Sequence, residues 1–254
     1  MITSEDGHDV FRSRGVELHH CDHQTLAAVM VTMGRRVDAV VVDAPYSERC
    51  HAGHDTQTAS VNEANASERS SLNYAPWGQP EVSSFCAHWS PLVADWIVSL
   101  TDSDLSPVWR AQFEAFGLLA FARVPSIETG ATVRFNGDGP PNWTVDVMPA
   151  RTRHPRHQGA WKPAPYYLGP RETKPVVGGK PLRLMRAIVS DYSCPGGLVC
   201  DPCAGGGTTL LAAVMEGRQA IGSEPMREHF DIACRRLSEM PLDNPRTGQA
   251  ALFR

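Results

Sequence analysis

The sequence has no long apolar run, no secretion-type N-terminus and no cysteine framework. None of its apolar stretches reaches the roughly 18 residues that a membrane span requires. Met1 to Asp9 is polar and acidic, without the apolar stretch of a secretory signal. The seven cysteines in 254 residues do not form the dense, even pattern of a small secreted domain. We therefore expect a reduced, cytoplasmic protein that does not bind membranes.

An overall excess of positive charge is also absent. The chain carries 24 Lys and Arg against 28 Asp and Glu, a net charge of −4, so any nucleic-acid binding must depend on a local patch. Residues 151–180 hold seven Lys or Arg and a single acid, which makes +6 locally and leaves −10 for the rest. Aromatic residues are interleaved there, so this interval predicts nucleic-acid contacts, and a solvated proline-rich loop is the alternative. The candidate contact residues are Arg151, Arg153, Arg156 and Lys162.

Apolar strands alternate with helical patterns along the chain. This alternation predicts an α/β fold with a doubly wound, mostly parallel sheet. Strands are expected at 16–20, 37–42, 96–100, 118–124, 198–200 and 219–223. Helices are expected at 24–33, 108–116, 182–192, 208–215 and 227–240, with one more opening at Pro91. The polar stretch 47–71 predicts a mobile loop or lid, and 125–178 an irregular segment.

A glycine turn follows the strand that ends at Asp201. Gly205, Gly206 and Gly207 lead directly into a helix that opens with Thr208, and glycines let the backbone approach a ligand closely. No Lys follows the glycines as a phosphate loop requires, and the spacing also misses the dinucleotide pattern. A carboxylate beside the turn suits a cationic or amino-bearing ligand.

A second acid, Glu224, ends the next strand about 20 residues further on. An acid at that place can accept hydrogen bonds from ribose hydroxyls. A ribose and an amino group without a phosphate clamp indicate S-adenosylmethionine as the ligand, and an ordinary strand-to-helix turn is the alternative. Cys200 and Cys203 have the spacing of half a zinc site or a redox pair, but no second such pair occurs, so we expect no metal centre.

The tetrapeptide Asp43-Ala44-Pro45-Tyr46 ends another buried strand. Pro45 restricts Ala44 to extended geometry and thereby directs its carbonyl. The carboxylate of Asp43 and this carbonyl are two neighbouring acceptors for the two N–H groups of an exocyclic amine. Tyr46 offers a flat face for an extruded base. Taken alone the motif is weak, since acid-x-Pro-aromatic turns are common.

Together these motifs give a family resemblance. Val37 to Tyr46 resembles the catalytic D-P-P-Y segment of amino-directed DNA methyltransferases, and residues 201–209 resemble their cofactor motif D-P-F-x-G-S-G-T-T. Gly179-Lys180-Pro181 and the helix after it are similar to the segment that precedes the cofactor motif. A catalytic motif ahead of the cofactor motif is the order of the β class. The resemblance implies the S-adenosylmethionine-dependent methyltransferase fold in permuted order, with boundaries at 1–124 (catalytic), 125–178 (target recognition) and 179–254 (cofactor).

The resemblance also implies roles for single residues. Asp43 and the Ala44 carbonyl, set by Pro45, would hold the target amine, and Tyr46 would stack on the base. Lys180 and Pro181 would flank the methionine carboxylate of the cofactor. The implied cofactor site consists of Asp22, Asp43, Lys180, Pro181, Asp201, Pro202, Cys203, Ala204, Gly205, Gly206, Thr208 and Glu224.

The activity that the resemblance implies is methylation of a flipped base in double-stranded DNA, without a metal, and a homodimer is a further expectation from the family. Two positions depart from the family pattern, because Ala44 replaces a proline and Cys203 replaces an aromatic residue. Asp rather than Ser at position 43 favours adenine N6 over cytosine N4. Other open alternatives are an RNA or protein amide substrate and a non-catalytic DNA-binding regulator. No nuclease motif is evident, so both a solitary enzyme and half of a restriction pair fit.

Overall fold

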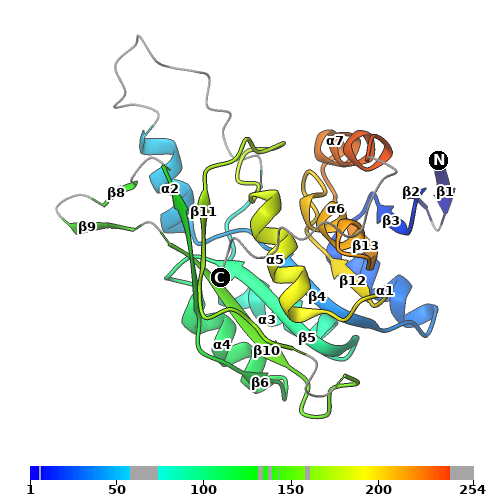
Figure 1. The fold of residues 1–254 in the computed structure, drawn as a ribbon, viewed down its shortest axis with the longest axis horizontal. Helices are drawn as coiled ribbons and strands as arrows, with labels where there is room; N and C mark the ends of the chain where they lie inside the picture. Colours follow the sequence, from blue (N-terminus) through cyan, green and yellow to red (C-terminus); the bar gives the residue numbers. More distant parts are fainter. Residues whose placement is uncertain are drawn as a thin grey trace, which may run out of the picture.

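A computed structural model describes residues 1–5, 7–57, 74–130, 134–136, 139–142, 144–157 and 161–240. These residues form three layers, with a twisted sheet between two sets of helices (Figure 1). The sheet has eleven strands within the described residues, in the order β1-β2-β3-β13-β12-β4-β5-β10-β7-β11 with β6 beside β10. No helix of this part of the chain is both long and apolar enough to span a membrane.

The centre of the sheet is parallel. Its five neighbouring strands are β3 (Val16–His19), β13 (Gln219–Ser223), β12 (Leu198–Asp201), β4 (Val37–Asp43) and β5 (Val93–Thr101). Every residue of β4 before its last is buried, since helices cover both faces. A strand buried on both faces needs a nearly continuous apolar run, which explains the Val-rich sequence of β4.

Alternate residues of β4 belong to two separate hydrophobic clusters. Ala39 and Val41 pack with the helices of one face, and Val40 and Val42 with those of the other, because successive strand side chains point to opposite faces. The first face is covered by α5 (Leu182–Tyr192), α6 (Thr208–Met215) and α7 (Arg227–Ser238). The second is covered by α1 (His23–Thr32), α3 (Gln79–Trp89) and α4 (Ser106–Ala115).

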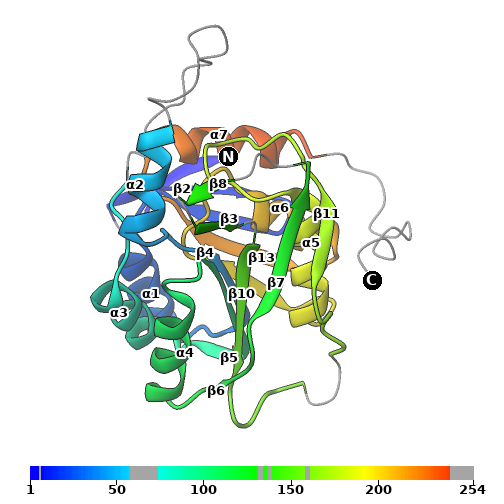
Figure 2. The ribbon, with the colours of Figure 1, turned by 90° about the vertical axis from the view of Figure 1, so that its left-hand side faces the viewer.

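Antiparallel strands extend the sheet at both flanks. On one side the hairpin β1 (Ile2–Glu5) and β2 (His8–Ser13) continues from β3. On the other side β10 (Thr144–Arg151) pairs antiparallel with β5 and with β7 (Val124–Thr129) (Figure 2). The remaining strands are β6 (Leu119–Ala120), β11 (Tyr167–Pro170), and the separate hairpin of β8 (Arg134–Asn136) and β9 (Gly139–Asn142).

The doubly wound α/β prediction is confirmed, and three local predictions are wrong. Pro91 opens no helix, because α3 precedes it and Pro91 lies in the turn into β5. Within the expected strand 118–124, only the short β6 forms before β7 begins. The segment 125–178 is not irregular throughout, since β10 lies within it and is mostly buried.

The polar stretch 47–71 also begins differently from the prediction. Residues Glu48–Gln57 form helix α2 rather than a loop, and 58–71 lie outside the described residues. The predicted division at 124 and 178 stays a prediction. The sheet itself runs through all three parts, because β4 from the first is hydrogen-bonded to β12 from the last.

Candidate active site

Three acids meet at one edge of the sheet. Asp43, Asp201 and Glu224 stand at or directly after the ends of β4, β12 and β13. These strands are parallel neighbours, so their carboxyl ends, where α/β sheets bind ligands, lie side by side. Asp201 is 2% exposed and Glu224 5%. The sequence-predicted catalytic and cofactor motifs, about 160 residues apart in the chain, therefore share one edge.

Asp43 is paired with a buried lysine. The Nζ of Lys180 lies 2.7 Å from Oδ2 of Asp43 and 3.0 Å from the carbonyl oxygen of Gly178. The same ammonium lies 4.8 Å from the centre of the Tyr46 ring, within range of a cation–π contact. The resemblance assigned Lys180 to the cofactor carboxylate, and the structure places it between the predicted catalytic acid and the predicted stacking ring.

The two oxygens of Asp43 differ. Oδ2 accepts the hydrogen bond from Lys180, whereas Oδ1 is buried and makes no hydrogen bond of ordinary geometry within the described residues. Burial raises the pKa of the Asp43 carboxyl, and Lys180 and the Tyr46 hydroxyl oppose that rise. A buried acceptor that makes no well-aligned hydrogen bond is costly in a folded protein, so Oδ1 is suited to an N–H donor from a ligand.

The Asp43-Ala44-Pro45-Tyr46 corner is fixed by backbone hydrogen bonds. The carbonyl of Tyr46 accepts from the amide of Trp77 at 3.0 Å. The amide of Ser47 donates to Oδ2 of Asp102 at 2.8 Å. Ala44 is buried. These contacts hold the corner even though Ala44 lacks the ring of the family's proline, and sequence reasoning missed Asp102, whose only signal was its place after the end of β5.

Glu224 closes the glycine turn. Its Oε2 accepts from the amide of Gly205 and its Oε1 from that of Met226, both at 2.8 Å. Gly205 has a φ of +51°, a left-handed conformation that favours glycine. Burial raises the pKa of the Glu224 carboxyl. Each oxygen has a lone pair left, so the fixed carboxylate can also accept hydroxyl donors.

Asp201 is the most deeply placed acid of the three. Burial raises the pKa of its carboxyl to about 7, while hydrogen bonds from Thr209 and the amide of Cys203 oppose the rise. The nearby carboxylates of Asp43 and Glu224 raise this pKa further. Three acids held close together at low exposure favour a positively charged ligand.

The segment before Lys180 lies over the glycine turn. A Cβ added to Gly206 would stand 2.9 Å from Cγ of Pro175 and 3.2 Å from Cγ1 of Val176. Thr208 opens α6 and accepts a hydrogen bond from Arg236 at 3.1 Å. Position 206 therefore has room for glycine alone while that segment keeps its place.

Other predicted cofactor residues have structural partners. Asp22 is the N-cap of α1, with its Oδ1 accepting from the amide of Thr25 at 2.8 Å. The carbonyl of Pro202 accepts from Ser223, and Pro181 caps α5. Ala204 is buried, and burial raises the pKa of the Cys203 thiol well above its usual range.

The predicted DNA contacts lie away from this edge. β10 runs antiparallel to β5, and its register pairs Asp146 with Thr101 but Arg151 with Trp96. β10 thus ends near the amino ends of the parallel strands, opposite Asp43 (Figure 2). There Arg156 lies 2.7 Å from Asp38. Arg153 and Lys162 are exposed on the same connection between β10 and β11.

Comparison with known proteins shows a similarity to one enzyme family. A family model for N6- and N4-directed enzymes, described as DNA methylase, matches residues 136–235. This part of the chain is therefore similar to the amino-directed DNA methyltransferases. The order of motifs along the whole chain, with the Asp43 motif ahead of the glycine turn, is that of the β class. The match covers the cofactor half of the site, and the Asp43 motif lies outside it.

Relatives support the same assignment over short stretches. The type II methyltransferase M.HindIII of Haemophilus influenzae is 43% identical over 61 residues, which is 24% of this chain and 20% of that protein. The DNA adenine methyltransferase YhdJ of Escherichia coli K12 is 41% identical over 58 residues, 23% of this chain and 20% of that protein. The aligned part thus spans about a fifth of these curated relatives.

Solved structures show the fold over nearly the whole chain. The M1.HpyAVI–SAM complex has a TM-score of 0.62 at 20% identity and covers 87% of this chain and 99% of that one. The cytosine-N4-specific PvuII DNA methyltransferase has a TM-score of 0.56 at 12% identity and covers 89% and 90%. The chain therefore has the fold of these methyltransferases.

Proposed function

We propose that the protein transfers a methyl group from S-adenosylmethionine to the exocyclic amino group of a base in DNA. The observation that carries this proposal is the meeting of Asp43, with its open Oδ1, and the Glu224-closed glycine turn at one edge of the sheet. Methyl transfer of this kind requires an acceptor for the target amine next to an acid that binds the nucleoside of the cofactor. Asp43 and Glu224 are suited to these two roles. The family match and the fold support the same reaction class.

The residues fit the cofactor. Buried Asp201 and Glu224, near Asp43, form an acidic surrounding that suits an amino group, ribose hydroxyls and a positively charged sulfur. When bound, the cofactor supplies a methyl group on sulfur that is already reactive toward an amine. Glu224 would hold the ribose. Asp201 and the backbone of residues 204–206 would hold the amino-acid end. Asp22, as a helix cap, would lie near the adenine end.

Asp43 and Ala44 would align the amine. Oδ1 of Asp43 and the carbonyl of Ala44 are the two acceptors, and Lys180 keeps the carboxylate from rotating by holding Oδ2. Fixing the nitrogen on a line with the methyl group lowers the entropic part of the barrier. Negative charge at Asp43 stabilises the positive charge that develops on nitrogen. The amine proton then leaves to water or to Asp43, whose raised pKa favours its acceptance.

The proposed substrate is double-stranded DNA with its target base flipped out, because a stacked base cannot bring its amino group to this edge. Tyr46 is the proposed stacking surface. We favour adenine N6, because position 43 carries Asp and the similar YhdJ is an adenine enzyme. Cytosine N4 is the second candidate, favoured by the likeness in fold to the PvuII enzyme. A cytoplasmic location, a homodimer and the DNA contacts of Arg151, Arg153, Arg156 and Lys162 remain predictions.

Mass spectrometry of digested DNA tests the proposal. DNA from methylation-deficient cells that express the chain is expected to contain N6-methyladenine, and DNA from cells with Asp43→Ala none. N4-methylcytosine instead would establish the second candidate. Purified wild-type protein that is folded and binds S-adenosylmethionine, yet modifies neither base on mixed-sequence duplexes, would sink the proposal.

A further inference from the structure

A cluster of histidine and cysteine side chains lies at the N-terminal flank of the sheet. Strand β3 directs Glu17 and His19 to one face, and Cys21 continues this row two residues on. β2 pairs antiparallel with β3, with Val10 opposite His19. Continuing that register places His8 opposite Cys21. His20, between His19 and Cys21, points to the other face and contacts the ring of Phe230.

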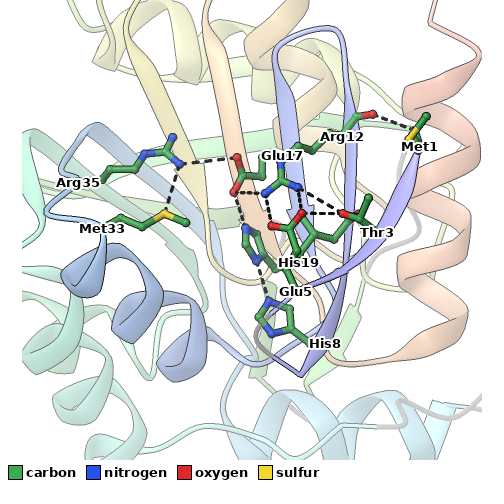
Figure 3. A network of polar contacts seen from close by, with 10 residues as sticks. Met1, Thr3, Glu5, His8, Arg12, Glu17, His19, Met33 and Arg35 are labelled. Atoms are coloured by element: carbon green, nitrogen blue, oxygen red, sulfur yellow. Dashed lines mark hydrogen bonds and ion pairs between the residues drawn. The ribbon is translucent and has the colours of Figure 1, made fainter.

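The potential ligand atoms converge. A ring nitrogen of His8, a ring nitrogen of His19 and the Sγ of Cys21 all lie within 4.8 Å of one another. Nε2 of His8 lies 2.8 Å from Nδ1 of His19 (Figure 3). Only small shifts separate this spacing from the tetrahedral arrangement of ligands about 2.0–2.3 Å from a zinc ion. His19 is 2% exposed, so the cluster is set into the protein.

Glu17 determines which nitrogen of His19 is available. Its Oε1 lies 2.8 Å from Nε2 of His19, and a carboxylate accepts only from an N–H. The proton therefore resides on Nε2, and Nδ1 presents its lone pair to His8 and Cys21. A carboxylate behind a ligating histidine is the common second partner in zinc sites. Glu17 is itself held by Arg12 and Arg35 (Figure 3), which keeps it out of the ligand set.

We propose that His8, His19 and Cys21 form a site for a divalent transition metal, with zinc as the favoured ion. Two imidazoles and one thiolate are a donor set that suits zinc, and calcium or magnesium would require oxygen ligands. The fourth position falls to water or an external ligand. Binding releases the Cys21 thiol proton to solvent, and neutral His8 keeps one ring proton, which moves from Nε2 to Nδ1 so that Nε2 can ligate the metal. The sequence predicted no metal centre, because ligand spacing along the chain does not reveal ligands that two paired strands bring together.

The site adjoins the proposed cofactor edge without belonging to it. The carbonyl of His19 accepts from the amide of Glu224 at 3.0 Å, while its side chain points into the cluster. The proposal does not depend on methyl transfer. A chain without methyltransferase activity can still bind the metal here.

Titration of the reduced, metal-free protein with Co²⁺ tests the site. We expect one equivalent to bind per chain, with a sulfur-to-cobalt charge-transfer absorption and a tetrahedral visible spectrum, and Zn²⁺ to displace it. Cys21→Ser is expected to abolish the sulfur absorption, and His8→Ala to weaken binding at least tenfold. Glu17→Gln is expected to weaken binding by about 10- to 100-fold through His19.

Matched controls are His20→Ala, at a position directly after β3 whose side chain points away from the cluster, and Cys194→Ser, and both are expected to bind Co²⁺ like the wild type. His8 stands at the flank of the sheet, so His8→Ala provides a folded variant if Cys21→Ser unfolds. Absence of stoichiometric binding overturns the proposal. So does a sulfur absorption that survives Cys21→Ser, which would move the site to Cys200 and Cys203.

Discussion

Lys180 holds one oxygen of Asp43 from 137 residues further along the chain, with 2.7 Å between its Nζ and Oδ2. The pair joins the predicted catalytic motif to the segment that leads into the cofactor half. Lys180 is 8% exposed, so neither water nor another cation readily replaces it. The charge state and the orientation of Asp43 therefore both depend on this lysine.

Replacing Lys180 tests that dependence through pH. Lys180 opposes the burial that raises the pKa of Asp43, so in Lys180→Met this pKa rises further. In the proposed mechanism the active form carries the ionised Asp43 carboxylate. The acidic limb of the kcat-against-pH profile is therefore expected to move to higher pH, with the greatest loss at low pH. Lys180→Arg keeps the charge and is the control. A limb that stays in place in Lys180→Met would contradict the role.

Asp201 makes stability depend on pH. Its pKa of about 7 lies above the usual 3.8, so the folded protein binds its proton more tightly than the unfolded chain does. Stability from this group is full below pH 3.8 and is lost as pH rises to about 7. Asp201→Asn removes the loss and retains an acceptor for the amide of Cys203. We expect the variant to gain a few kcal/mol relative to wild type at pH 8, on the order given by 1.36 kcal/mol per pKa unit.

Urea unfolding at pH 4.5 and at pH 8, without cofactor, measures this difference. The comparison of two proteins cancels the titration of the other acids. An equal difference between wild type and Asp201→Asn at both pH values would contradict the raised pKa.

Gly206→Ala tests the contact of the glycine turn with Pro175 and Val176. The new Cβ would stand 2.9 Å from Cγ of Pro175, so the segment leading to Lys180 must shift. Calorimetric titration is expected to show roughly tenfold weaker binding of S-adenosylmethionine, equivalent to about 1.4 kcal/mol. Gly78→Ala is the control, because its Cβ would meet only ordinary contacts at 3.5 Å and beyond. Unchanged affinity in Gly206→Ala would show that this segment does not shape the cofactor site.

DNA contacts are expected at the edge where Asp43 lies. Arg49 on α2 follows the Tyr46 corner, pairs with Asp104 and is 62% exposed, whereas Arg156 pairs with Asp38 at the opposite edge of the sheet. Arg49→Ala is expected to weaken duplex binding and to reduce the slope of log affinity against log salt by about one. Arg156→Ala is expected to leave both unchanged and to cost at most about 1 kcal/mol of stability. Fluorescence anisotropy at several salt concentrations compares the two, and the reverse ranking would restore the sequence-based assignment.

Periodicity predicted the parallel centre of the sheet well and its flanks poorly. β4, β12 and β13 are buried on both faces, and a strand buried on both faces requires a short apolar run that can be recognised in the sequence. β10 mixes Asp146 and Pro149 with apolar residues, so it lacks a clear signal and becomes a strand through its pairing with β5 and β7. β1 and β2 lie at the other flank of the sheet and contain many polar residues, so they also lack a clear strand signal in the sequence.

The positions of the strand-end acids were predictable from the sequence, whereas the contacts around them were not. Motif order placed Asp43 and Asp201 at strand ends, and parallel topology then requires them to be neighbours. The partners of Lys180 and Arg156 depend on how loops return over the sheet, which no local pattern encodes. The charge count over 151–180 treated these basic residues as one patch. In the structure, β10 and the connection after it place them at different points along the length of the sheet.

The hydrogen-bonded neighbours β4 and β12 come from distant parts of the chain. A break in the peptide chain between β11 and α5 would thus leave two fragments, each with two open rows of backbone donors and acceptors that only the other can fill, because β13 and β12 lie between β3 and β4. Such fragments, expressed together, should reassemble, and the activity of this protein could then be made conditional on bringing two separate polypeptides into one cell.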